Sequence, residues 1–281
     1  MSMNYANLLS NLPNISIMGV ISLFLLIIMR IGPILVLAPF FGAKLAPGIA
    51  RLGLAVFIAA IFLPFIATHV KAPLSFDMSF VLYSLKEILI GLIIGFFITV
   101  PFYIVQTSGT IIDYLRGASI MQSQDPLMQT QTSPIGILYN YILIVIFFQI
   151  NGPLLFFDSL LRSYALIPPT ELINPVFFSV KSTFWKMSFD VINEIVTIAI
   201  QMAAPALVAI LMAEMFLGIA NRLAPQVQIA FLGMSIKSLL GLALLWTAWF
   251  FILKQFTKHS YSWIELLDKL IYSMKALIPQ S

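Results

Sequence analysis

The sequence predicts an all-α integral membrane protein, and three observations support this fold class. Of the 281 residues, 60% are hydrophobic and only 9% are charged, whereas about 25% of the residues in soluble domains are charged. Apolar runs long enough for membrane helices recur along the chain. The long alternation of apolar and polar residues that a membrane β-barrel requires is absent from the sequence. The length suits several helices in a single membrane domain over residues 1–281.

Three helices are expected in the first part of the chain. Residues 15–41 are long enough to span a bilayer of about 30 Å, and Pro33 is expected to kink this segment near Arg30. The apolar run over residues 54–66 is short for a span and suits a half-helix or a helix packed within protein. A long helix is expected over residues 80–105.

Gly91 and Gly95 form a G-x-x-x-G pair within this long helix. Such a pair lets the backbone of another helix approach closely. The pair also arises by chance in apolar helices, so a helix-packing role is one of two readings.

The second part of the chain predicts further helices. Residues 135–157 form an apolar span that is interrupted at residues 151–153. Residues 190–221 form a helix that Pro205 is expected to kink. Residues 227–253 form the last long apolar helix.

Residues 254–281 form a basic tail. Apolar residues recur at helical spacing over residues 261–277, which predicts an amphipathic helix on the surface. The excess of lysine places the tail in the cytoplasm by the positive-inside rule. The N-terminus has no basic region before the first apolar run, so a cleavable signal peptide is not expected.

Residues 106–134 form the longest polar interruption, with Asp113, Arg116 and Asp125 among many Ser, Thr and Gln residues. Loops of this length are uncommon and often functional. One interpretation is a solvated loop outside the membrane. The other is irregular polar backbone lining a cavity, which a membrane tolerates only where protein or water surrounds it.

Several polar and charged residues stand inside or at the ends of apolar segments. They are Arg30, Glu87, Glu214, Asn221, Arg222 and Lys237. An ionisable group at membrane depth is costly unless it finds a partner or a wet cavity. These residues are therefore candidates for buried charge pairs or subunit contacts. The alternatives are an Arg30 side chain that reaches the lipid headgroups and an Arg222 that caps a turn at the membrane face.

The sequence carries no catalytic constellation. It lacks the phosphate-binding glycine loop, the dinucleotide fingerprint and the hydrolase motifs. It has no cysteine and two distant histidines, so neither a metal site nor a cofactor is expected. Scattered basic residues argue against nucleic-acid binding.

Two classes of function remain. The first is a secondary transporter for a small solute or ion, with broken helices around a midplane site. The second is a non-enzymatic subunit of a larger membrane assembly. A carrier of the first class should show an internal repeat, and the two halves of this sequence show no convincing similarity.

Three stretches of the sequence carry a family resemblance. The C-terminal stretch reads Glu214-x-x-Leu217-Gly218-x-x-Asn221-Arg222-x-x-Pro225-Gln226, followed by Ile236-Lys237-Ser238. The N-terminal stretch combines Arg30-x-x-Pro33, Ala38-Pro39-x-Phe41-Gly42 and Pro47-x-x-x-Arg51. The central stretch reads Glu87-Ile88-Leu89-Ile90-Gly91-x-x-x-Gly95-Phe96. Together, and in their order along the chain, they resemble the signatures of the FliR/SctT family, the R/T component of the type III export apparatus. The C-terminal form is closer to the injectisome branch than to the flagellar one.

The resemblance implies kinked helical hairpins, similar to a P-like and a Q-like export-gate subunit joined in one chain. It implies a structural and gating subunit in the bacterial inner membrane that helps to form and plug a pore for unfolded polypeptides. The implied partners are P/R-type and Q/S-type subunits, a U/FlhB-type switch protein, exported polypeptides and membrane lipid, with no nucleic acid.

The resemblance also favours a pore plug over a plain loop within residues 109–126. The expected plug residues are Gly109, Gly117, Ala118, Ser119, Ile120, Met121, Gln122 and Ser123. Glycine adopts backbone conformations that other residues avoid, and polar side chains tolerate water when a plug moves.

Overall fold

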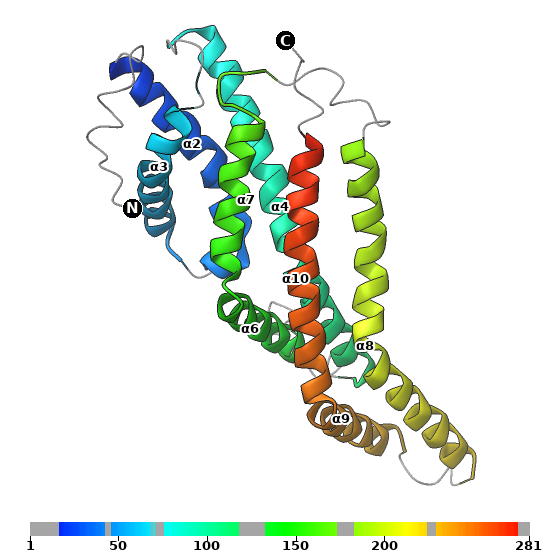
Figure 1. Ribbon diagram of the computed structural model, residues 1–281. Helices are drawn as coiled ribbons and strands as arrows, with labels where there is room; N and C mark the ends of the chain where they lie inside the picture. The colour runs from blue at the N-terminus through cyan, green and yellow to red at the C-terminus, as the bar shows by residue number, and fades with distance from the viewer. Residues whose placement is uncertain are drawn as a thin grey trace. The chain divides into compact units, whose positions relative to one another are not determined.

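The computed structural model describes residues 17–42, 46–68, 70, 76–117, 133–172, 183–223 and 229–274. Every regular element within these ranges is a helix (Figure 1), which confirms the all-α class. In chain order the elements are α2 (Ile17–Leu37), the short 3-10 helix η1 (Pro39–Phe41), α3 (Gly48–Ala67), α4 (Met78–Leu115), α6 (Pro134–Gln149), α7 (Gly152–Leu166), α8 (Thr183–Leu223), α9 (Ile229–Thr247) and α10 (Trp249–Ser273).

Four of the described helices are long and apolar enough to cross a membrane: α2, α3, α4 and α8. Two pairs, α6 with α7 and α9 with α10, pass the same test together but bend at a short break. The membrane class predicted from composition is therefore confirmed by the lengths of the helices.

Helix α3 corrects the expectation of a short apolar run over residues 54–66. The helix begins directly after Pro47 and runs for 20 residues to Ala67. A proline immediately before the first turn is compatible with a helix start, and neither Arg51 nor Gly53 interrupts the helix. The segment therefore has the length of a full span.

Helix α4 corrects the expected start of the polar loop at residue 106. It continues to Leu115, and polar side chains of this part bond to carbonyls of the same helix. Ser108 donates to the carbonyl of Val105 at 2.7 Å, and Thr110 donates to that of Gln106 at 2.9 Å. Satisfied in this way, hydroxyl side chains are compatible with an apolar setting.

The C-terminal part also differs from the prediction. The helix expected over residues 227–253 ends at Thr247, and α10 then runs as one helix of 25 residues. The amphipathic pattern predicted for the tail is present, but its apolar side chains are buried in protein rather than lying on a membrane surface: Trp263, Leu267 and Leu270 are 7%, 1% and 1% exposed. The indole N–H of Trp263 donates to the Phe97 carbonyl at 2.8 Å.

The contacts divide the chain into two compact units. Unit 1 comprises Met1–Thr99, Asn151–Asp190 and Trp263–Ser281, and unit 2 comprises Val100–Ile150 and Val191–Ser262. Helices α4, α8 and α10 contribute residues to both units. The single domain over residues 1–281 therefore stays a prediction.

In unit 1, α2 packs closely against the N-terminal part of α4. Gly91 faces the backbone of Arg30, and a Cβ atom added there would overlap the Arg30 carbonyl oxygen. A Cβ added to Gly95 would lie 3.2 Å from the Cα of Ile34. The G-x-x-x-G pair thus stands where two helix backbones approach each other.

In unit 2, α4 and α6 make a similar close contact. A Cβ added to Gly109 would lie 2.6 Å from the Cα of Gly136. Beyond this contact, Tyr139 of α6 packs edge-on against Phe256 of α10, with ring centroids 5.2 Å apart. Phe102 and Phe147 pack in the same way at 5.7 Å.

We expect Gly91→Ala to lower the stability of the protein by about 1–3 kcal/mol, because α2 and α4 must move apart to accept the methyl group. Thermal unfolding of the full chain in detergent measures the change. Gly53→Ala is the matched control, since open space surrounds that position and alanine favours a helix by up to ~1 kcal/mol over glycine. Equal unfolding midpoints for Gly91→Ala and Gly53→Ala would contradict the close packing of α2 against α4.

Candidate functional site

Unit 1 contains a fully buried ion pair between Arg30 and Glu87. Arg30 donates from Nε to Glu87 Oε2 at 2.5 Å and from Nη2 to Oε1 at 2.9 Å. It also donates to Ser163 Oγ at 3.0 Å and to the Ile167 carbonyl at 2.8 Å. The Tyr164 ring lies 3.9 Å from the guanidinium carbon. Both charged side chains are 0% exposed, so this bidentate pair is screened little by water.

Lys86 supplies a second cation to the same carboxylate. Its Nζ lies 2.8 Å from Glu87 Oε1. It also donates to the carbonyls of Pro168, Pro169 and Glu171 at 2.7, 3.0 and 2.9 Å. The lysine therefore holds the chain that follows α7 against α4.

We define Arg30, Lys86 and Glu87 as the unit 1 ion cluster. It joins three helices, α2, α4 and α7, and the turn after α7. Its charged atoms bond to protein groups rather than facing open space, as buried charges require. Each charged nitrogen and oxygen of the cluster has a partner among the described residues, which fits a structural role.

A second buried cluster lies in unit 2, where α4 ends and α6 begins. Asp113 Oδ1 accepts from Arg116 Nε at 2.6 Å. Asp113 Oδ2 accepts from Ser133 Oγ at 2.5 Å and from the backbone N–H of Ile135 at 2.9 Å. Ser133 Oγ in turn accepts from the Gly136 N–H at 2.9 Å and so caps α6.

We call this second group the Asp113 clamp: Asp113, Arg116 and Ser133. One carboxylate bonds to residues on both sides of the intervening residues 118–132. Arg116 extends the clamp to α9 by donating to Ser238 Oγ at 3.3 Å. The ends of the polar segment are therefore tied together by charge-assisted hydrogen bonds.

The expected plug residues stand at this clamp and beyond it. Gly109 lies inside α4, one turn before Asp113. Gly117 follows the end of α4 with a φ of +84°, a left-handed conformation that favours glycine. Residues 118–123, which hold the other expected plug residues, lie outside the described residues.

The charged residues near the end of α8 are more exposed. Lys237 of α9 pairs with Glu214 of α8, and their side chains are 18% and 50% exposed. Asn221 and Arg222 lie exposed in the last turn of α8. The structure therefore brings Glu214 and Lys237 together and leaves Arg222 on the surface of unit 2.

Sequence reasoning did not single out Lys86, Asp113, Arg116, Ser133 or Ser163 as site residues. Two signals were available. Asp113 and Arg116 have the spacing of helical neighbours, and Ser133 directly before Pro134 is typical of a helix start. Ser163 carries no comparable signal, because its contact with Arg30 joins residues 133 positions apart.

Comparison with known proteins places the chain among export proteins. A sequence model described as "Bacterial export proteins, family 1" matches residues 21–262. The "Yop proteins translocation protein T" of Yersinia pestis is 37% identical over 161 residues, which cover 57% of this chain and 60% of that protein. The "Flagellar biosynthetic protein FliR" of Bacillus subtilis is 30% identical over 224 residues, covering 79% of this chain and 84% of that protein. The "Surface presentation of antigens protein SpaR" of Salmonella typhimurium is 28% identical over 216 residues, covering 77% and 78%. The chain thus matches less than two thirds of the Yersinia protein's length.

We expect Glu87→Gln to destabilise the protein by about 3–5 kcal/mol, because Arg30 and Lys86 are then buried without a counter-ion. Arg30→Met is expected to cost less, since Lys86 still compensates the carboxylate. Thermal unfolding in detergent gives both values.

The control is Asp158→Asn, which breaks the exposed pair with Arg162 at 2.7 Å. Exposed pairs contribute about 0–1 kcal/mol. An unfolding midpoint for Glu87→Gln as high as that for Asp158→Asn would contradict the role of the unit 1 ion cluster.

Proposed function

Because the chain belongs to family 1 of the bacterial export proteins, the FliR/SctT family, we propose that it is a pore-forming and gating subunit of a type III protein-export gate. Its place is the bacterial inner membrane, which fits the apolar helices α2, α3, α4 and α8. Its fold is a P-like and a Q-like gate subunit joined in one chain. Its relatives are named as a translocation protein, a flagellar biosynthetic protein and a surface presentation of antigens protein.

The observation that carries the gating proposal is the Asp113 clamp. A plug must stay attached at its base while its tip blocks or leaves the pore. The clamp ties Arg116 and Ser133, which flank residues 118–132, to one carboxylate that is 5% exposed at its side chain. Hydrogen bonds to a charged group contribute about 1.5–3 kcal/mol each. The base of the proposed plug is therefore held more firmly than a solvated loop requires.

The proposed substrate is an unfolded polypeptide that is threaded through the pore. The chain has no nucleotide-binding motif, so other components of the export apparatus supply the energy. The role of this subunit is to form the conduit and to keep it closed to small ions between substrates.

The proposed contacts with neighbouring subunits lie on the α8–α9 hairpin. Alongside the Glu214–Lys237 pair, α8 exposes Met215, Phe216 and Ile219, which are 72%, 80% and 59% exposed. Large apolar side chains beside charged ones suit an interface with other membrane subunits. P/R-type and Q/S-type subunits and the U/FlhB-type switch protein are the proposed partners.

We expect small deletions within residues 117–123 to make the inner membrane leak small ions, because the plug no longer fills the closed pore. Conductance of cells or membranes that carry the assembled gate measures the leak. Unchanged conductance, with the variant present at wild-type amounts, would count against plugging. If the isolated chain alone conducted ions, and this conductance depended on a small solute, the result would instead favour the secondary transporter.

A substitution in the Asp113 clamp tests whether the clamp holds the plug, separately from whether the plug residues fill the pore. Asp113→Asn keeps the size of the side chain but removes its charge, and the expected loss of about 1.5–3 kcal/mol loosens the base that positions the plug, so we expect the closed gate to leak small ions. Asp158→Asn, at an exposed pair in unit 1, serves as the control and should not leak. A leak-tight Asp113→Asn gate would show that the clamp does not hold the plug.

A further inference from the structure

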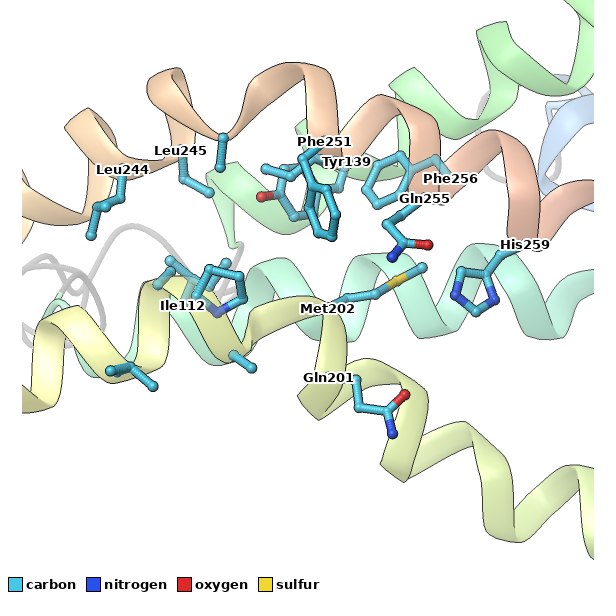
Figure 2. A pocket seen from close by; sticks show the side chains of 16 residues that line it. Ile112, Tyr139, Gln201, Met202, Leu244, Leu245, Phe251, Gln255, Phe256 and His259 are labelled. Atoms are coloured by element: carbon cyan, nitrogen blue, oxygen red, sulfur yellow. The ribbon is translucent and has the colours of Figure 1, made fainter.

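Unit 2 contains a cavity of about 400 Å³, and none of the three residues of the Asp113 clamp lines it. Helices α8, α9 and α10 supply most of its lining, while Ile112 of α4 and Tyr139 of α6 complete it. Figure 2 shows Leu244 and Leu245 toward one end of the cavity, and Gln201, Gln255 and His259 toward the other. The cavity therefore has an apolar end and a polar end.

Tyr139 lies between the two ends (Figure 2). This side chain is 1% exposed, and within the described residues its hydroxyl group has no hydrogen-bond partner. A buried hydroxyl without a partner is destabilising by about 1–3 kcal/mol, and such groups are rare in folded proteins. A hydroxyl in this position can donate a hydrogen bond to an acceptor oxygen of a ligand in the cavity.

The backbone of α8 adds an acceptor at the polar end. Pro205 has no N–H, so the carbonyl of Gln201 one turn earlier lacks its usual helical donor. The ribbon of α8 changes direction beside Gln201 and Met202 (Figure 2). Polar groups thus gather at the end formed by Gln201, Gln255 and His259.

The lining residues restrict the chemistry of the ligand. None of the 16 side chains that line the cavity is a carboxylate, a lysine or an arginine. A charged group inside such a cavity would be costly. Lys254 and Lys258 are exposed on α10, next to Gln255 and His259 in the sequence. An apolar chain therefore suits the interior, and the exposed lysines of the same helix offer positive charge to an anionic group outside the cavity.

We propose that this cavity binds one acyl chain of a membrane phospholipid. The ester carbonyl of that chain accepts a hydrogen bond from the Tyr139 hydroxyl, the methylene groups extend toward Leu244 and Leu245, and the phosphate lies toward Lys254 and Lys258. The volume is near the lower end of ligand pockets, roughly 300–1,000 Å³, which suits one chain rather than a whole lipid. Helix α8, whose residues line the cavity, is a candidate membrane helix. Membrane phospholipid is therefore available to the cavity.

The test uses the full chain in vesicles of phosphatidylethanolamine and phosphatidylglycerol, with a phosphatidylglycerol probe that carries a diazirine in one acyl chain. After illumination, mass spectrometry of the digested protein maps the labelled residues. We expect labelling of Leu244 and Leu245 to saturate as the probe fraction rises, because a site can fill. Labelling of Met212, which is 64% exposed on α8 and outside the cavity, should rise in proportion to the probe.

Two variants locate the binding. Tyr139→Phe removes only the hydroxyl, and we expect half-saturation to need about fivefold more probe. Tyr141→Phe is its control, since that side chain is 51% exposed on the same helix. Ala204→Phe fills the cavity and should abolish the saturable label while Met212 stays labelled. If Ala204→Phe fails to fold, the comparison of Tyr139→Phe with Tyr141→Phe still tests whether the Tyr139 hydroxyl binds the probe.

Three results would overturn the proposal. Labelling of Leu244 and Leu245 could rise without saturation, as at Met212. Tyr139→Phe and Tyr141→Phe could require equal amounts of probe. In cells, a photo-reactive residue at Phe251 could crosslink to a protein instead of a lipid, which would make the cavity a protein interface. The first two results leave the proposed export function unaffected, because its argument rests on the Asp113 clamp and the family match.

Discussion

The carboxylate of Glu87 is the group on which the packing of unit 1 depends. It is fully buried between two cations, Arg30 and Lys86, and these cations bind further groups on α7 and on the turn after it. The contact requires α2 and α4 to lie unusually close together. Gly91, one helical turn beyond Glu87, provides that approach, because its missing Cβ makes room for the Arg30 carbonyl. Gly91 and Glu87 therefore lie on one face of α4, where the glycine allows α2 to approach and the carboxylate binds Arg30.

Helix α4 uses the same combination a second time, in unit 2. Gly109 lets the backbone of α6 approach at Gly136, and Asp113, one turn later, bonds to Ser133 and Ile135 at the start of that helix. Residues four apart lie on the same face of a helix, so each glycine brings a partner segment within reach of its carboxylate. In unit 1 the result is a buried structural cluster. In unit 2 it is a clamp at the base of the proposed plug.

Much of this organisation follows from the sequence, and the failures have physical causes. Composition and apolar run length predict the helical membrane class, and Gly91, Gly95, Arg30 and Glu87 can be singled out because small and charged residues are conspicuous in apolar helices. The end of α4 cannot be predicted in this way, because hydroxyl groups such as Ser108 bond to their own helix. The burial of Trp263 and the contact of Ser163 with Arg30 depend on distant segments, which no local pattern encodes.

The central claim is that this chain works inside an export gate, and the most direct test is its composition after gentle purification. The tagged chain would be co-expressed with its neighbouring membrane genes, extracted in mild detergent and weighed by native mass spectrometry. The account predicts a large complex with several copies of other small membrane proteins and few copies of this one. A monomer or homodimer without partners, under conditions that preserve other membrane assemblies, would contradict it and favour a carrier that acts alone.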